Sequence, residues 1–289
     1  MIDLSQLSPM MQHYMETKKE YPDCVLFYRL GDFYEMFFDD ALTVSKELEI
    51  TLTGKDCGLS ERAPMCGVPF HAVDSYLYRL VQKGYKVAIA EQMEDPKQAK
   101  GLVKREVIRV VTPGTITSSQ VLDETKNNYL MGIVYMDGIY GISTADISTG
   151  DFMVTEVDSD RELFDEINKF SPSEIICNNA FYMSGVDMDE LKNRYQVVIS
   201  ALDSRFFGEE SCRRILMEHF KVGALVGLGL EDYATGIIAA GAVMQYIYET
   251  QKSTLEHITT ITPYSTGQYM VIDTSTRRNL ELVETMREK

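Results

Sequence analysis

The sequence predicts an α/β protein made of two successive domains, with the start of a third region behind them. Up to residue 113, short apolar runs alternate with helical periodicities, which is the pattern of a compact α/β unit with a mixed sheet. Residues 114–127 are polar and indicate a linker. From residue 128, three β-rich runs follow one another with only tight turns between them, which predicts an antiparallel meander.

The first domain, residues 1–113, should begin with a helix. Ser8 is a favourable N-cap, Pro9 is a favourable first helical residue, and Pro22 ends the helix. The apolar run 24–30 (CVLFYRL) then predicts a buried strand, and Gly31-Asp32 predicts a turn.

After that turn the spacing favours a helix. Apolar side chains recur on one helical face at Phe37, Ala41, Val44 and Leu48. Phe33 lies on the same stripe extended backwards, so it would precede the helix, and Glu35 would lie in the first helical turn. The remaining elements of this domain are expected to be a strand at 49–53, a loop at 54–67, a helix at 74–83 closed by Gly84, and strands at 86–93 and 105–114.

The second domain, residues 128–254, opens with the meander. Its three strands are expected at 129–136, 138–147 and 151–157. Helix, strand, helix and strand should follow at 161–170, 174–177, 187–195 and 196–200, and then two helices at 209–221 and 231–252. Three hairpin-linked strands that lead into α/β elements are similar to the ribonuclease H-like architecture, an analogy of fold that implies no activity.

Residues 255–289 are expected to begin a third, helical core region. Thr274, Ser275 or Thr276 could cap a helix that runs to Lys289, where the sequence stops. We therefore expect the chain to be the front part of a longer protein.

Composition argues against several classes of protein. The net charge of −16 is unlike that of a general nucleic-acid binder, but residues 1–115 hold 14 basic and 17 acidic side chains and are almost neutral. No run of 18 apolar residues predicts a membrane span, and the N-terminus lacks the pattern of a secretory signal. The five cysteines form no CxxC pair, so we expect reduced thiols in a cytoplasmic protein.

Phe33 and Glu35 allow two interpretations from the residues alone. A Phe just ahead of a helix usually packs on its first turn, and an acid there is favoured by the helix dipole. The alternative is functional. An apolar ring at a turn can wedge between base pairs from the minor groove, and unstacking costs less at a mismatch, where pairing is already poor. A neighbouring carboxylate could accept a hydrogen bond from a base N–H or, when protonated, donate one to a purine nitrogen, and it would repel well-paired DNA.

The segment GDFYEMFFDDA at 31–41 resembles the mismatch-recognition motif of the bacterial MutS family. Further segments that resemble the family lie in order along the whole chain: SPMMQHY at 8–14, APMCGVPFHAV at 63–73, VAIAEQMEDP at 87–96, REVIRVVTPGT at 105–115, STADISTGDF at 143–152 and TRRNLEL at 276–282. The resemblance implies a mismatch-recognition domain and a connector domain that bind mismatched double-stranded DNA. It also implies that Phe33 is the intercalating wedge and Glu35 the carboxylate that contacts the mispaired base.

Contacts with the DNA backbone would fall to the basic residues of the first domain. The candidates are Lys55, Lys104, Arg105 and Arg109, each of which could equally be an ordinary solvated charge. Met65, in the same loop as Lys55, could reach the minor groove or belong to the core.

The resemblance also implies what this chain should not do by itself. Complete members of the family are ATPases that use ATP and Mg²⁺, and no GxxxxGK[ST] segment occurs between Met1 and Lys289. We therefore expect no cofactor, no enzymatic activity and no DNA clamp in this chain. The family forms homodimers, but this chain should be a monomer or weak dimer, in the bacterial cytoplasm with the nucleoid.

Two other functions remain open. The acidic second domain could act as an interaction module that docks a MutL-type repair protein without any autonomous DNA recognition. Alternatively, Asp146 could belong to a metal-dependent nuclease, but no companion acids stand at obvious positions in the neighbouring strands. Cys57, Cys66 and His71 match no zinc-ligand spacing.

Overall fold

The computed structural model describes residues 4–94, 101–117, 126–266, 276 and 279–280. The chain divides into two compact units. The first comprises Met1–Lys126 with Glu249–Ser253, and the second comprises Asn127–Tyr248 with Thr254–Lys289. No helix within the described ranges is long and apolar enough to cross a membrane.

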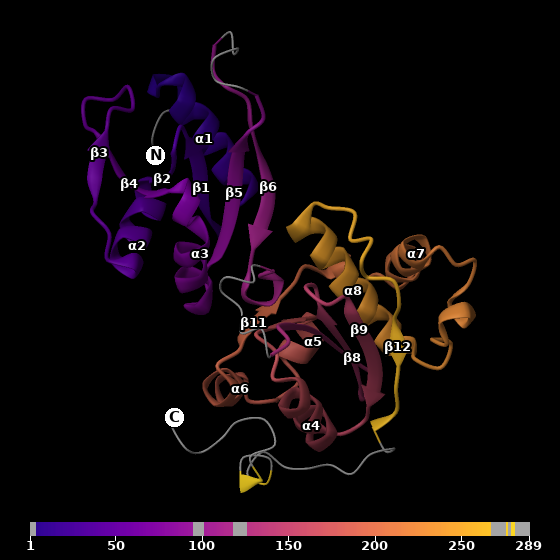
Figure 1. Cartoon of the computed structure of the whole chain (residues 1–289). Helices are drawn as coiled ribbons and strands as arrows, with labels where there is room; N and C mark the ends of the chain where they lie inside the picture. The colour runs from indigo at the N-terminus through magenta and orange to yellow at the C-terminus, as the bar shows by residue number, and fades with distance from the viewer. Residues whose placement is uncertain (1–3, 95–100, 118–125, 267–275, 277–278, 281–289) are drawn as a thin grey trace. The chain divides into compact units, whose positions relative to one another are not determined.

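The first unit is built on a six-stranded mixed sheet with the strand order β3-β4-β2-β1-β5-β6 (Figure 1). Strands β1 and β5 are parallel, and the other neighbours are antiparallel. The strands are β1 Cys24–Leu30, β2 Phe33–Phe37, β3 Thr53–Lys55, β4 Ala63–Pro69, β5 Lys86–Gln92 and β6 Arg105–Val111. The helices are α1 Pro9–Glu20, α2 Phe38–Leu48 and α3 Val73–Gln82, with short 3₁₀ turns at Leu4–Gln6, Phe70–Ala72 and Pro113–Thr115.

Helices cover both faces of this sheet. Alternate side chains of β1 point to opposite faces, as in any strand. Leu26 and Tyr28 pack with Met11 and Tyr14 of α1. On the other face, Phe27 packs in the cluster that contains the apolar residues of α2 and α3. The sheet therefore has an α1 face and an α2/α3 face.

Most expected elements of the first unit are confirmed, but Phe33 and Glu35 both lie on a strand that precedes the helix, so Glu35 is not in the first helical turn. Residues 33–37 form β2, which pairs with β1 across a two-residue turn. Gly31 supplies the positive φ of +59° that this tight turn needs. The aromatic residues of the segment suit a strand, and helix α2 begins only at Phe38.

Two expectations downstream of α2 are also wrong. The strand expected at 49–53 starts only at Thr53, because Glu49 ends α2 in the left-handed conformation with φ +58°. The loop expected at 54–67 contains strand β4 from Ala63 onward, which pairs with both β2 and β3. This extra strand lies directly beside Glu35.

The second unit is built on another six-stranded sheet, with the order β11-β10-β7-β8-β9-β12 (Figure 1). The strands are β7 Tyr129–Met136, β8 Ile139–Asp146, β9 Asp151–Val157, β10 Glu174–Cys177, β11 Val198–Ala201 and β12 Thr262–Pro263. The helices are α4 Asp160–Phe170, α5 Asn179–Tyr182, α6 Met188–Tyr195, α7 Glu209–Phe220 and α8 Ala234–Gln251, with 3₁₀ turns at Ser204–Phe207 and Leu225–Leu228. The antiparallel meander β7–β8–β9 and the parallel strands β10 and β11 confirm the predicted ribonuclease H-like architecture.

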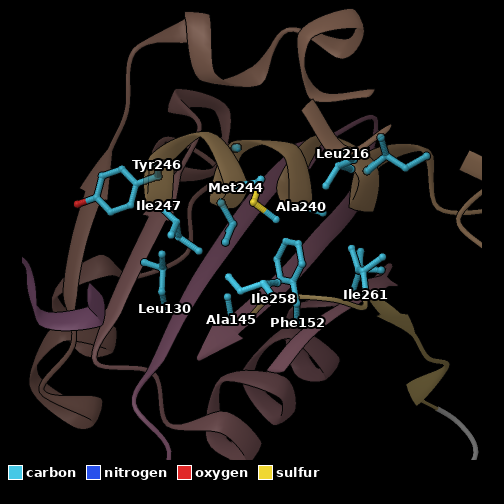
Figure 2. Packing of buried hydrophobic residues seen from close by; sticks show 14 of the residues in the cluster. Leu130, Ala145, Phe152, Leu216, Ala240, Met244, Tyr246, Ile247, Ile258 and Ile261 are labelled. Atoms are coloured by element: carbon cyan, nitrogen blue, oxygen red, sulfur yellow. The ribbon is translucent and has the colours of Figure 1, made fainter. Parts of the chain in front are cut away.

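Helix α8 packs very closely on one face of this sheet, while α4, α5 and α6 cover the other. Figure 2 shows Met244 and Ile247 above Leu130, Ala145 and Phe152 of the strands. Two strand glycines allow this approach. A Cβ at Gly132 would meet Val243 Cγ2 at 2.4 Å, and a Cβ at Gly141 would meet the Thr235 backbone at 2.4 Å.

The segment expected to start a third region at residue 255 belongs partly to the second unit. Leu255, Ile258 and Ile261 are buried in the core under α8, and β12 pairs with β9. The burial of these apolar side chains explains the difference. Of the helix expected to begin at Thr274–Thr276, the structure describes only Thr276, Asn279 and Leu280, where Thr276 and Asn279 are helical and the Leu280 N–H donates to the Thr276 carbonyl at 2.9 Å. The rest of that helix, and residues 118–125 of the expected linker, lie outside the described residues.

Candidate nucleic-acid interface

Phe33 is the first residue of β2 and lies at one end of the first sheet. It pairs with Leu30 of β1 and with Pro69 of β4. Its side chain is 45% exposed, although the neighbouring Tyr34 and Met36 are buried. The ring therefore does not belong to the core, and the hairpin presents it to solvent.

Glu35 lies two residues after Phe33 on β2, and its side chain is on the α1 face of the sheet. Its neighbours across the ladder are Tyr28 of β1 and Gly67 of β4. The Glu35 carboxylate accepts a hydrogen bond from Lys55 Nζ, with Oε2 and Nζ 2.5 Å apart. The Lys55 ammonium also lies 5.6 Å from the centre of the Phe37 ring. Two of the residues predicted to contact DNA thus pair with each other.

Gly67 of β4 lies beside Phe33 and Glu35 and has no side chain, so the space next to these two side chains is open. A Cβ at this position would lie 3.5 Å from Glu35 Cγ and 3.7 Å from Phe33 Cδ1. The backbone does not require glycine here, because Gly67 is not among the residues with positive φ. A glycine inside a strand often marks a place where a ligand or another backbone approaches closely.

Tyr28 and Arg105 form the inner wall of the site. Arg105 is buried, and it donates hydrogen bonds from Nε to the Arg29 carbonyl at 2.7 Å and from Nη1 to the Val103 carbonyl at 2.7 Å. Its guanidinium lies 5.0 Å from the centre of the Tyr28 ring, and His13 Nδ1 lies 2.7 Å from the Tyr28 hydroxyl. Burial raises the pKa of Tyr28, and the Arg105 charge partly opposes this. Arg105 therefore holds the end of the sheet together.

The other two basic candidates are not gathered around Phe33. Lys104 is exposed and forms an ion pair with Glu106 at 2.6 Å. Arg109 pairs in register with Ile89, which packs on the α2/α3 face, and it lines a small pocket with Asp74, Leu77 and Tyr78. The structure therefore brings Lys55 and Arg105 to the face that carries Glu35 and leaves Arg109 on the opposite one.

Sequence reasoning did not identify Gly67, Tyr28 or the structural role of Arg105. The signal for Gly67 is present in the segment CGVPF, an isolated glycine among apolar residues, but the neighbouring polar residues favour a loop there. Tyr28 carries no such signal, because a tyrosine in an apolar strand is indistinguishable from an ordinary core residue.

Asp146 has a structural role in the turn between β8 and β9. Its carboxylate is buried and accepts hydrogen bonds from the backbone N–H groups of Asn128 at 3.1 Å and Ser148 at 2.8 Å, and from the Ser148 hydroxyl at 2.6 Å. Throughout the described part of the chain, no group of three or more His, Cys, Asp or Glu side chains could hold a metal ion. These contacts give Asp146 no geometry for two-metal catalysis.

The fold and this site indicate a two-domain α/β protein with an exposed recognition site on its first domain. An α/β domain presents an exposed aromatic ring beside a carboxylate at one end of its sheet, and a ribonuclease H-like domain follows it in the chain. Models of two protein-family domains match these two regions. They are MutS domain I over residues 8–120 and MutS domain II over residues 128–259.

Similar proteins come from several bacteria, and each is named DNA mismatch repair protein MutS. The relative from Lachnoclostridium phytofermentans is 63% identical over 286 residues, covering 99% of this chain and 31% of the relative. Those from Acetivibrio thermocellus and Ruminiclostridium cellulolyticum are 54% and 51% identical over 289 residues, covering 99% of this chain and 33% of each relative. The chain thus spans about a third of the length of the curated relatives it matches. It belongs to the MutS family and comprises its domains I and II.

Proposed function

We propose that this chain binds mismatched double-stranded DNA in DNA mismatch repair, with Phe33 as a wedge that enters the duplex at a mispaired or unpaired base. The observation that carries the proposal is the exposed Phe33 ring on a hairpin, directly beside the Glu35 carboxylate. The names of the relatives support the coarser statement, a role in DNA mismatch repair.

The wedge detects deformability of the duplex and not its sequence. Inserting a ring unstacks one base step at a cost of a few kcal/mol, and this cost is lower where the pair is already disrupted. A protein whose ring is already held in solvent loses little of its own packing on insertion. The free energy of binding therefore differs between mismatched and paired DNA because the two duplexes cost different amounts to deform, as in indirect readout.

Glu35 and Lys55 would have different electrostatic roles, Glu35 toward the mispaired base and Lys55 in neutralising the Glu35 charge. The carboxylate contacts the edge of the mispaired base, for which it is an acceptor of base N–H groups. Beside phosphates an unpaired carboxylate would repel DNA, and the Lys55 ammonium at 2.5 Å offsets that repulsion. On this basis the exposed Lys104 is available for the DNA backbone, while Lys55 is committed to Glu35 and Arg105 to two carbonyl groups.

The remaining properties of the family are proposed for the protein of which domains I and II form part. Hydrolysis of ATP with Mg²⁺ and clamping of DNA by a homodimer would reside in other regions, since the present sequence has no GxxxxGK[ST] segment. Domains I and II would supply recognition and connection without catalysis. The site of action would be the nucleoid in the bacterial cytoplasm.

A second candidate function is favoured by the charge of the chain beyond residue 115, which contains the second unit. Of the net charge of −16, residues 116–289 carry −13, which suits a protein partner better than DNA. Docking of a MutL-type protein on this unit is compatible with DNA binding by the first. It would be the main function of this chain if the chain did not distinguish mismatched from paired DNA.

The test is fluorescence anisotropy at low salt with two labelled duplexes, one fully paired and one with an unpaired thymine. We expect the 289-residue chain to prefer the defective duplex, and we expect Phe33→Ala to remove the preference while leaving salt-dependent binding to both duplexes. Equal binding of the wild type to both duplexes would contradict autonomous recognition and would favour the interaction module.

A further inference from the structure

A cluster of four side chains lies directly behind the hairpin that presents Phe33. Arg29 of β1, Tyr34 of β2, Glu91 of β5 and Phe70 after β4 meet at this end of the sheet. Arg29 and Tyr34 are cross-strand partners, and Tyr34 packs on the α2/α3 face. The cluster therefore lies on the opposite face from Glu35 and Lys55, and it plays no part in the contacts proposed above.

Arg29 is the centre of the cluster. Its Nε donates to the Gly31 carbonyl at 2.5 Å, and its Nη1 lies 3.3 Å from Glu91 Oε1. Its guanidinium lies 4.0 Å from the centre of the Phe70 ring and 5.5 Å from that of Tyr34. A single planar group thus contacts the turn, a neighbouring strand and two rings, which a lysine ammonium could not do.

Tyr34, Glu91 and Phe70 also make hydrogen bonds close to the Gly31-Asp32 turn. The Tyr34 hydroxyl donates a hydrogen bond to Glu91 Oε1, so two strands are joined through one carboxylate. The Phe70 N–H donates to the Asp32 carbonyl at 2.9 Å. Gly31 and Asp32, the two turn residues that precede Phe33, are therefore each held by a hydrogen bond from this cluster.

The ion pair between Arg29 and Glu91 is largely shielded from solvent, unlike an ordinary surface ion pair. The side chains of Arg29 and Glu91 are only 16% and 23% exposed. A two-residue turn with no such support would let the hairpin tilt, and the free energy needed to order it would then oppose binding. A functional side chain needs a supporting shell that fixes its position within a fraction of an ångström.

We propose that Arg29, with Glu91, is a positioning residue that holds the β1–β2 hairpin rigid so that Phe33 can enter the duplex. This inference rests on the proposed wedge function of Phe33. Arg29 itself does not touch DNA. It acts on mismatch preference only through the ring that it positions.

A direct phosphate contact by Arg29 would have different consequences. Loss of a phosphate contact weakens binding to all duplexes about equally and reduces the salt dependence of binding by about one unit of log–log slope. Loss of a positioning residue lowers the preference for the defective duplex and leaves the salt slope unchanged. The two roles are therefore separable in one titration series.

The experiment compares Arg29→Lys and Glu91→Gln in the 289-residue chain, using paired and unpaired-thymine duplexes at several salt concentrations. Arg29→Lys keeps the charge but loses the planar fork, and Glu91→Gln makes the domain less acidic without altering its shape. Arg79→Lys is the matched control, because Arg79 of α3 donates to the Leu48 carbonyl at 3.1 Å, away from the hairpin. Thermal unfolding of each variant verifies that it is folded.

We expect both hairpin variants to lose about threefold to tenfold in the affinity ratio between the two duplexes, the range typical of coupling between contacting groups. In a Phe33→Ala background the same substitutions should have no further effect on the ratio. The inference is overturned if the ratio is unchanged, which includes an equal fall in the affinity for both duplexes, or if the effects of Arg29→Lys and Phe33→Ala add.

Failure of the proposed function itself would look different. In that case the wild type would show no preference for the defective duplex, or Phe33→Ala would retain the preference. A wild-type preference that depends on Phe33 but not on Arg29 or Glu91 would overturn the positioning role alone.

Discussion

At the scale of single residues, the Glu35–Lys55 pair sets the charge of the face that we propose contacts DNA. The carboxylate is half-buried, and Lys55 is its ion-pair partner. An ion pair of this partial exposure contributes modestly to stability, so its main consequence is electrostatic. With Lys55 in place, the potential near Glu35 is close to neutral, and phosphates can approach.

Removing the ammonium should therefore weaken DNA binding in general. We expect Lys55→Met, which keeps an apolar stem near Phe37, to lower the affinity for paired and mismatched duplexes by roughly threefold to fivefold. The cause is repulsion between phosphates and an unneutralised Glu35. Adding Glu35→Gln to Lys55→Met should restore binding to paired DNA. Anisotropy titrations of both variants check this, and unchanged affinity in Lys55→Met would contradict it.

The residues of the site were predictable to different degrees. The pairing of an aromatic ring with a carboxylate two residues later is a local pattern, and the family resemblance gave it a function. The Glu35–Lys55 contact depends on β4 and β3 returning beside β2, and no local pattern encodes it. The participation of Arg29 and Glu91, which are far apart in sequence, likewise requires the parallel pairing of β1 and β5.

At the scale of elements, the strand pair β2–β4 determines how much space lies beside the Phe33 ring, the proposed wedge. Gly67 faces Glu35 across the ladder, and its missing side chain leaves the flank of the Phe33 ring open. The atom nearest to a methyl group at this position would be the Tyr34 carbonyl oxygen at 3.3 Å, which requires only a small adjustment. The strand can therefore accept alanine, but the space beside the ring becomes narrower.

We expect Gly67→Ala to change the thermal midpoint by less than about 4 °C, because reduced freedom of the unfolded chain offsets the close contact. Affinity for the unpaired-thymine duplex should nevertheless fall about threefold or more, since a displaced base would meet the new methyl group. Gly223→Ala is the control, because a Cβ there would have no neighbour within 4 Å. Full mismatch affinity in Gly67→Ala would show that no base lies against β4.

Elements with a strong intrinsic pattern were predictable, and those that depend on tertiary pairing were not. Helix α1 between Ser8 and Pro22, strand β1 and the meander β7–β9 follow from the position of Pro9 at the helix start, apolar runs and turn residues. The local pattern of β2 favours the approach to a helix instead, because Phe33 and Phe37 also fit a helical spacing of four. Pairing with β1 and β4 on both sides outweighs that spacing.

At the scale of the whole molecule, all five cysteines are free and buried. Burial raises the pKa of the Cys24 thiol to about 11 and those of the Cys66, Cys177 and Cys212 thiols to about 12. In the unfolded chain these thiols ionise near pH 9, so the fold favours their protonated form. The corresponding stability is present in full below about pH 9 and is lost as the pH rises through the folded values.

We therefore expect the free energy of unfolding to decrease between pH 8 and pH 10, by roughly 1 kcal/mol for each such thiol. Urea denaturation at the two pH values measures the decrease. The Cys66→Ala variant should show a smaller decrease than the wild type. A midpoint that does not move between pH 8 and pH 10 would contradict the assignment of buried, protonated thiols.

The distribution of charge also belongs to this scale. The nearly neutral first segment can approach DNA, whereas the second carries most of the net charge of −16. Composition alone indicated this division, because charge is additive along the sequence. The positions of individual cations relative to Phe33 could not be obtained in this way, and Arg109 in particular lies on the other face of its sheet.

The most direct measurement is the fluorescence of 2-aminopurine placed next to an unpaired thymine in a duplex, titrated with the 289-residue chain. Insertion of the Phe33 ring unstacks the neighbouring base, so we expect a rise in fluorescence with wild type and none with Phe33→Ala at saturating protein. An equal rise with Phe33→Ala, or no rise with the wild type when anisotropy shows that the duplex is bound, would contradict the wedge.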